Sequence, residues 1–335
     1  MTESYKKVLK KIPGLVRLYK YFRGAKITTL HRIFRYDRDR LLKYAFKPSA
    51  SKEGLMARII MAYHIVEKGL TMPEMRLGFG RDNLLFLISA LHSFAESYGR
   101  EDPQFRVAVS VVAEYNKVHE EKGFKLDAEL ENAIKTLLEL IPVTPSRQIT
   151  MTRESYWRDI NAPFEVFAAS RHSVRNFEGT ISMEQIRKAI SIANNAPSAC
   201  NRQFMRVHCV TKPEEIQRCL SLQNGNRGFG HLVDKLLILT ADLRGLVWME
   251  ERNDAFTNAG IYLMNLCYAL HHCRVAHCLL NWSVSPVVDY QLHTTINIPD
   301  PETIVVLIAC GGVPERFKVT SSPKKSVEET LVLHI

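Results

Sequence analysis

The sequence predicts an α+β fold for the C-terminal part of the chain, preceded by a mainly α-helical N-terminal region. Two observations carry this prediction. Apolar residues recur at helical spacing through four stretches, 54–66, 84–98, 105–119 and 127–141. After residue 160, helical stretches alternate with short apolar runs that are typical of buried strands. We expect these strands at residues 206–211, 235–240, 274–280 and 303–309.

The composition favours a globular protein with a sizeable core. Of the 335 residues, 46% are hydrophobic and 24% are charged. No run approaches the roughly 18–20 apolar residues that span a bilayer. The seven cysteines are odd in number and form no CxxC pair, which indicates reduced thiols rather than a disulfide framework. We therefore expect a cytoplasmic protein.

The basic charge of the chain lies at its N-terminus. Residues 1–50 hold 14 Lys or Arg against 3 Asp or Glu, whereas the other 285 residues hold 31 against 32. We read residues 1–50 as a basic helical segment. It could touch the anionic inner face of a membrane, as a peripheral contact, or be an ordinary solvated or partner-covering helix. Nucleic-acid binding is not expected, since no recognition module accompanies the charge.

Two further regions follow the basic segment. Residues 51–150 form a helical extension, and residues 151–335 form the α+β domain, with residues 141–160 expected to be a linker. Within the domain, residues 161–170 should be a helix, and Ser182 with Gln185 predicts a capping box. The helix expected over residues 255–273 is apolar on nearly all sides, so it should lie at the centre of the domain or at a subunit interface.

A turn rich in His, Glu, Lys and Gly should separate the first two helices of the extension. Residues 64–70 and 78–80 make up this turn. One interpretation is a functional loop, a candidate lid over a site, formed by His64, Glu67, Lys68 and Phe79. The other is a helix cap at Gly69 followed by a purely structural turn.

The strongest local signal lies in residues 170–177, Ser-Arg-His-Ser-Val-Arg-Asn-Phe. In an extended segment alternate side chains point the same way, so Arg171, Ser173 and Arg175 can converge on one anion. Guanidinium groups suit phosphate because they donate two parallel hydrogen bonds. A solvated basic loop remains the alternative.

A second signal is the stretch 195–204, Asn-Ala-Pro-Ser-Ala-Cys-Asn-Arg-Gln-Phe, between a helix and a strand. Small residues with free N–H groups and amide side chains can read the edge of a planar heterocycle. By itself the stretch is an ordinary polar turn.

Together these elements resemble the nitroreductase family of flavoproteins, whose pattern is "SRRSVRxF", a capped helix and then "APSAxNxQPW". The helix and strand over 259–282 look like the family's long helix followed by "GLGTCW". Residues 311–314 and 323–329 are similar to its "vGyP…RKPLEEvv" ending. The resemblance covers residues 161–335 and implies a mixed or antiparallel sheet flanked by helices, in a homodimer with FMN at the subunit interface.

The resemblance also implies which residues bind the flavin. Phosphate, ribityl chain and pyrimidine edge would be met by Arg171, His172, Ser173 and Arg175, with Lys324 or Lys325 completing the phosphate site. The other subunit would supply Pro197, Ser198, Ala199, Asn201 and Gln203. The flavin ring would lie along Leu279, Leu280 and Asn281, with Asn224 near its edge. No metal ligands are expected.

The implied function is an FMN-dependent oxidoreductase that carries hydride from NAD(P)H to a small organic acceptor by a ping-pong mechanism. Flavin N5 would carry the hydride, so no catalytic side chain is required. Phe204-Met205 replaces the family's Pro-Trp, which puts the substrate face in doubt. The extended architecture resembles members linked to bacterial surface-polysaccharide biosynthesis. The alternative function is a membrane-associated flavin-binding partner protein with little or no redox turnover.

Overall fold

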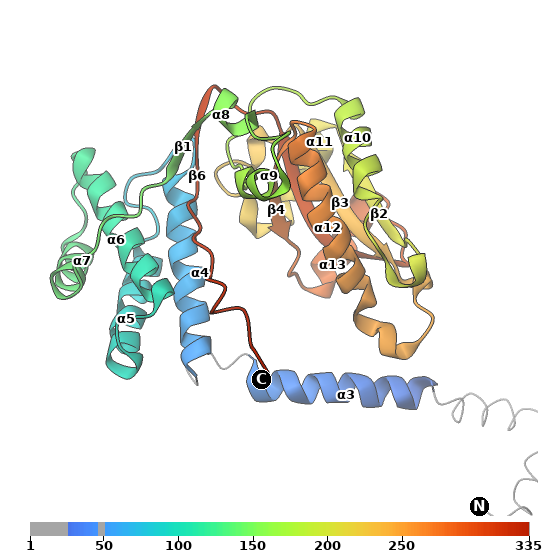
Figure 1. Cartoon of the computed structure of the whole chain (residues 1–335), viewed down its shortest axis with the longest axis horizontal. Coiled ribbons are helices and arrows are strands. Elements are labelled where there is room, and N and C mark those ends of the chain that lie inside the picture. Colours follow the sequence, from blue (N-terminus) through green and yellow to red (C-terminus); the bar gives the residue numbers. More distant parts are fainter. Residues whose placement is uncertain (1–25, 46–50, 335) are drawn as a thin grey trace, which may run out of the picture.

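The computed structural model describes residues 26–45 and 51–334 (Figure 1). The predicted basic segment therefore lies partly outside the described residues. Its described part is the helix α3, Lys26–Tyr44. None of the described helices is both long and apolar enough to cross a bilayer.

The predicted mainly α-helical character of the N-terminal region is confirmed over residues 52–140. Its four helices are α4 (Lys52–Leu70), α5 (Arg81–Tyr98), α6 (Pro103–Glu121) and α7 (Ala128–Leu140). Side chains of Ser51, Asp102 and Asp127 cap three of the N-termini, satisfying backbone N–H groups that have no partner within the helix. The helices share a buried core of their own, to which Leu87 and Leu91 contribute.

The predicted turn at residues 64–70 is wrong, because α4 continues to Leu70 and its C-cap is Thr71. Gly69 lies inside the last turn of α4. A Cβ at Gly69 would overlap the ring of Phe79, so the glycine permits close packing rather than ending the helix. His64, Glu67 and Lys68 thus project from a rigid helix and not from a loop.

The C-terminal part has the predicted α+β architecture. Four strands form an antiparallel sheet in the order β2-β3-β5-β4. Their bounds are β2 Met205–Val210, β3 Lys235–Asp242, β4 Ala276–Asn281 and β5 Glu302–Gly311. Every residue of β3 is buried, which explains its continuous apolar run.

Helices cover both faces of this sheet. The helices are α9 Phe164–Ser170, α10 Met183–Ala193, α11 Pro213–Ser221, α12 Asp254–His272 and α13 Pro286–Thr295. Leu237 and Leu239 of β3 pack with α10 and α12, whereas Leu236 and Ile238 pack with α11 and α13. This alternation is the two-residue period of a strand buried on both faces. The capping box of Ser182 and Gln185 forms as predicted.

The predicted linker at 141–160 contains two elements, which corrects that expectation. They are the strand β1 (Ile149–Thr152) and the helix α8 (Arg153–Trp157). β1 pairs antiparallel with β6 (Arg316–Val319), some 165 residues later. After β6 the chain runs back along α4, so the C-terminal segment lies between the helical extension and the sheet (Figure 1).

Candidate functional site

The predicted phosphate segment lines a cavity of about 730 Å³. One wall comes from residues 168–175, a second from residues 320–324 after β6, and a third from α4. The cavity thus collects side chains that are far apart in the sequence. The pairing of β1 with β6 brings the second wall back toward the helical extension.

Backbone geometry explains why the side chains of residues 171–175 gather here. α9 ends at Ser170, and Arg171 has an extended conformation. The Val174 N–H donates to the His277 carbonyl oxygen at 3.0 Å, and the Val174 side chain is fully buried. With Val174 turned inward, Arg171, Ser173 and Arg175 face the cavity, as the alternation predicts.

Arg175 is the most unusual of these residues. Its side chain is only 8% exposed, yet its buried Nη1 has no hydrogen-bond partner among the described residues. Charge-assisted partners are normally found for such groups, because burying an unpaired charge is costly. The pKa of Lys68 is lowered, by burial first and then by Arg175 itself. Arg175 and Lys68 therefore lie close enough for each to disfavour the charge of the other, an effect that a nearby anion would relieve.

Neutral histidines lie beneath the Arg171–Arg175 segment. Burial lowers the pKa of His271 to about 3 and that of His277 to about 4, and the charge of Arg171 adds to both shifts. His271 Nε2 lies 2.9 Å from the Ser170 hydroxyl, at the point where α9 ends. These rings support the segment without adding charge to it.

The wall from α4 carries an ordered pair, His64 and Glu67. His64 Nδ1 lies 3.2 Å from Glu67 Oε2, while Glu67 Oε1 accepts the Ser322 N–H at 3.3 Å. Glu67 is fully buried, and His64 is 38% exposed. Of the predicted lid residues, His64 and Glu67 therefore line the cavity together with the predicted phosphate residues.

Lys324 lines the cavity, whereas Lys325 is exposed and does not line it. His172 also lines it, and its pKa is lowered by burial, with further contributions from Arg171 and Lys324. A neutral His172 leaves the positive charge of the cavity with Arg171, Arg175 and Lys324.

Phe79 lies elsewhere, which separates it from the other lid residues. Its ring packs edge-on against the ring of Tyr115, with 5.2 Å between the ring centroids. The N–H of the neighbouring residue, Gly78, donates to His119 Nε2 at 3.0 Å. This turn belongs to the core of the helical extension.

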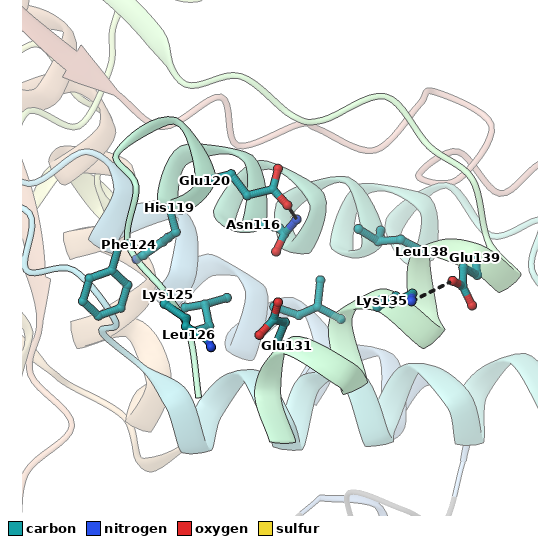
Figure 2. Close-up of a pocket in the computed structure, with 11 residues that line it drawn as sticks. Asn116, His119, Glu120, Phe124, Lys125, Leu126, Glu131, Lys135, Leu138 and Glu139 are labelled. Carbon is teal, nitrogen blue, oxygen red and sulfur yellow. Dashed lines mark hydrogen bonds and ion pairs between the residues drawn. The ribbon is translucent and has the colours of Figure 1, made fainter. Parts of the chain in front are cut away.

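His119 borders a second hollow of about 410 Å³ between α6 and α7 (Figure 2). Both of its ring nitrogens are engaged within the protein, Nδ1 by the Tyr115 carbonyl oxygen.

The stretch 195–204 lies at a different, smaller cavity of about 210 Å³, lined by Pro197, Ser198 and Gln203. Cys200, Asn201 and Gln203 all have positive φ, between 49° and 55°. Non-glycine residues rarely adopt this conformation, and clusters of them occur at binding sites.

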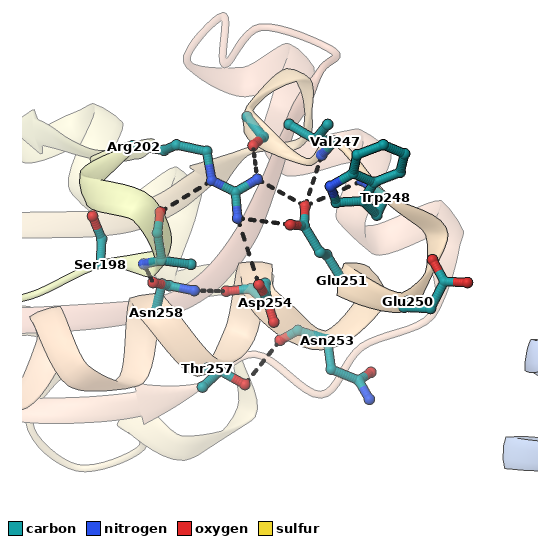
Figure 3. A network of polar contacts seen from close by, with 12 residues as sticks. Ser198, Arg202, Val247, Trp248, Glu250, Glu251, Asn253, Asp254, Thr257 and Asn258 are labelled. Atoms are coloured by element: carbon teal, nitrogen blue, oxygen red, sulfur yellow. Dashed lines mark hydrogen bonds and ion pairs between the residues drawn. The ribbon is translucent and has the colours of Figure 1, made fainter.

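Arg202 holds this strained loop in place (Figure 3). Its guanidinium makes a two-pronged ion pair with Glu251, at 2.7 and 3.0 Å, and its Nε donates to the Ala199 carbonyl oxygen. Asn258 Oδ1 of α12 accepts the Ala199 N–H at 2.6 Å. The loop is thereby fixed to the beginning of α12.

The remaining predicted flavin residues, at and near the end of β4, differ in how exposed their side chains are. Leu279 is 38% exposed, whereas Leu280 is 3% exposed and packs in the core. Any contact of Leu280 with a ligand would therefore be made by its backbone, and its place in the flavin site stays a prediction. Asn281 and Asn224 are exposed near one another, since Gln223, next to Asn224, donates to the Asn281 carbonyl oxygen at 3.0 Å.

Sequence reasoning missed several lining residues of the large cavity. They are Ile60, Tyr63, Tyr268 and the hydroxyl residues Thr320, Ser321 and Ser322. The positions 60, 63, 64 and 67 share one face of a helix, so helical spacing could have grouped them. The hydroxyl residues carry no local signal. In the described part of the chain, no group of three His, Cys, Asp or Glu side chains could hold a metal ion.

Comparison with known proteins gives one family. The model of the nitroreductase family matches residues 168–227, which include both the Arg171–Arg175 segment and the strained loop. No curated protein matches the chain.

The solved structures that resemble this chain are distant from it. A structure described as an NADH dehydrogenase/NAD(P)H nitroreductase from Parabacteroides distasonis is 19% identical, with a TM-score of 0.43 over 49% of this chain and 92% of that one. An NAD(P)H:FMN oxidoreductase from Staphylococcus epidermidis is 16% identical, with a TM-score of 0.46 over 52% and 96%. A nitroreductase with FMN from Desulfovibrio desulfuricans is 16% identical, with a TM-score of 0.43 over 52% and 98%.

The sequence match is confined to residues 168–227, so it supports the family for that segment. The resemblance predicted from residues 170–177 and 196–204 is confirmed by the match over residues 168–227, and this segment is a nitroreductase-family segment.

Proposed function

We propose that the protein is an FMN-dependent oxidoreductase that takes hydride from NAD(P)H and passes it to a small organic acceptor. One observation carries the proposal: a buried arginine, Arg175, has an unpartnered guanidinium nitrogen at a cavity that also contains Arg171 and Lys324. Such an arrangement fits a bound anion.

The residues of the cavity suit the polar part of FMN. Its volume of about 730 Å³ lies within the range of small-molecule sites, roughly 300–1,000 Å³. Cations for a phosphate lie beside hydroxyl groups of Ser173 and Thr320 that could bind a polyol chain. We assign Arg171 and Lys324 to the phosphate and Arg175 to the pyrimidine edge. The flavin would supply the hydride-carrying group.

The protein residues would then act by binding and electrostatics. Arg175, aided by Lys68, would stabilise negative charge that develops on the pyrimidine edge when the cofactor is reduced. Leu279, Asn281 and Asn224 would border the ring. NAD(P)H and the acceptor would occupy this face in turn, which is the ping-pong order predicted from the resemblance.

We propose that the protein works as a homodimer. α12 leaves Phe256, Ile261 and Met264 41–55% exposed in the single chain, although the opposite side of the helix is buried. An exposed apolar face of this kind is typical of an interface. The strained loop 198–203 is fixed at the beginning of the same helix, so a partner docked on α12 could bring its own loop to this cavity.

The domain division at residues 50 and 150 remains a prediction, as does a peripheral membrane contact through residues 1–50. The link to surface-polysaccharide biosynthesis and the cytoplasmic location are likewise predictions. The membrane contact is tested by sedimentation with vesicles of anionic lipid. Removal of residues 1–50 should abolish co-sedimentation, and an unchanged fraction in the pellet would refute the contact.

Steady-state oxidation of NADH and NADPH, with a quinone or a nitroarene as acceptor, tests the enzyme proposal. We expect turnover that depends on both substrates and on bound FMN. Arg218→Met, which replaces an exposed arginine of α11 away from the cavity, is the control variant and should turn over like the wild type. Bound FMN that neither nicotinamide reduces would refute the enzyme and favour the flavin-binding partner protein.

A further inference from the structure

We propose that the helical extension is part of the cofactor site itself, and that His64 of α4, held by Glu67, contacts the phosphate group of the mononucleotide. The inference rests on the proposed function and adds a residue outside the segment that matches the nitroreductase family, which begins at residue 168. For His64 and Glu67 it replaces the prediction of a lid with that of a wall of the cavity.

The His64–Glu67 pair determines which ring nitrogen can meet a ligand. A carboxylate only accepts hydrogen bonds, so His64 Nδ1 must donate to Glu67 Oε2 over their 3.2 Å separation. None of the described residues hydrogen-bonds Nε2. When the ring carries both protons, Nε2 is also a donor, which is what a phosphate oxygen requires. Nε2 is therefore the ring atom that can face an anion, while Glu67 holds the ring through Nδ1.

Glu67 also fixes the wall that carries Lys324. Its second oxygen, Oε1, accepts the Ser322 N–H at 3.3 Å, two residues before Lys324. The fully buried carboxylate thus joins α4 to the C-terminal segment across 255 positions of sequence. Both oxygens of Glu67 accept hydrogen bonds from the protein, so Glu67 holds the two walls together. The same hydrogen bonds partly offset the negative charge that Glu67 presents to an incoming anion.

The character of the cavity indicates which part of the mononucleotide His64 meets. Its lining is rich in cations and hydroxyl groups, and Glu67 is its one acidic residue among those described. A phosphate and a polyol chain suit such a lining better than a planar aromatic ring does. The exposed residue Leu279 and the strained loop, which suit a ring, are not part of it. His64 is therefore assigned to the phosphate end.

Binding to the full-length apoprotein tests the assignment, with FMN and riboflavin as the two probes, because riboflavin lacks only the phosphate. His64→Gln should weaken FMN binding by about 10- to 100-fold, the loss expected for one charge-assisted hydrogen bond. Riboflavin binding should change by less than about twofold. The matched control is His31→Gln, an exposed histidine on α3.

A second variant tests the role of Glu67 as a positioning residue. Glu67→Gln should weaken FMN binding and spare riboflavin, and the double variant should bind FMN no more weakly than His64→Gln alone, since both act through one contact. Equal losses for FMN and riboflavin, or unchanged FMN binding in His64→Gln, would overturn the inference while leaving the flavin site intact. Failure of the wild-type protein to bind either probe would overturn the proposed function as well.

Discussion

Replacement of Arg175 by methionine should stabilise the apoprotein while weakening FMN binding. Arg175 is 8% exposed, its Nη1 has no partner among the described residues, and its charge adds to that of nearby Lys68. An unpaired buried charge opposes folding until a ligand neutralises it. Methionine has a similar length and no charge, so it removes this opposition and fills much of the same space.

The magnitude follows from the unsatisfied guanidinium group. A buried donor without a partner costs about 1–3 kcal/mol, and more when it is charged. We expect Arg175→Met to raise the free energy of unfolding of the apoprotein by about 1–3 kcal/mol. For a chain of this size, the melting temperature should rise by roughly 2–4 °C for each kcal/mol. FMN binding should weaken by about 10- to 100-fold, because one charge-assisted hydrogen bond is lost.

Urea denaturation of the apoprotein measures the first effect, and titration with FMN measures the second. Arg218→Met on the exposed face of α11 should leave stability within about 0.5 kcal/mol and FMN binding unchanged. A destabilised apoprotein that binds FMN normally would show that Arg175 is a structural residue and not a ligand of the cofactor.

Three other perturbations test the account. The pKa values of His271 and His277 in the folded state lie below the usual 6.5, so the unfolded chain takes up more protons in acid. The free energy of unfolding should therefore be highest above pH 6.5 and fall as the pH drops toward 4. A urea midpoint that stays the same between pH 7 and pH 5 would contradict this expectation. Gly69→Ala should cost about 1–3 kcal/mol, because its methyl group would meet the packed ring of Phe79; a melting temperature equal to that of the wild type would disprove this packing. Arg202→Met should release the strained loop, so hydrogen exchange at residues 198–203 should accelerate, and unchanged protection would show that the ion pair does not hold the loop.

The sequence predicted the elements whose signals are local. The alternation of residues 171–175 placed their side chains together because Val174 is buried, and the apolar runs predicted all four strands of the sheet. The family match over residues 168–227 falls on the same local motifs. Spacing and residue type were sufficient for these features, since each depends on neighbours in the chain.

Long-range contacts produced the errors and omissions. Strand β1 has only four residues and is paired only through β6, so no periodicity separated it from a linker. The sequence allows a loop or a helix cap at Gly69, and its close contact with Phe79, which excludes both, cannot be seen in the sequence. The contact of Glu67 with Ser322 joins residues 255 positions apart, and it is this contact that makes α4 a wall of the cavity.

The absorption spectrum and flavin content of the purified protein show whether the cavity binds a flavin. If the cationic cavity of Arg171, Arg175 and Lys324 binds a mononucleotide, the protein should be yellow, or become so with added FMN, at one FMN for each chain. A protein that stays colourless after incubation with excess FMN and removal of the unbound cofactor would contradict the account.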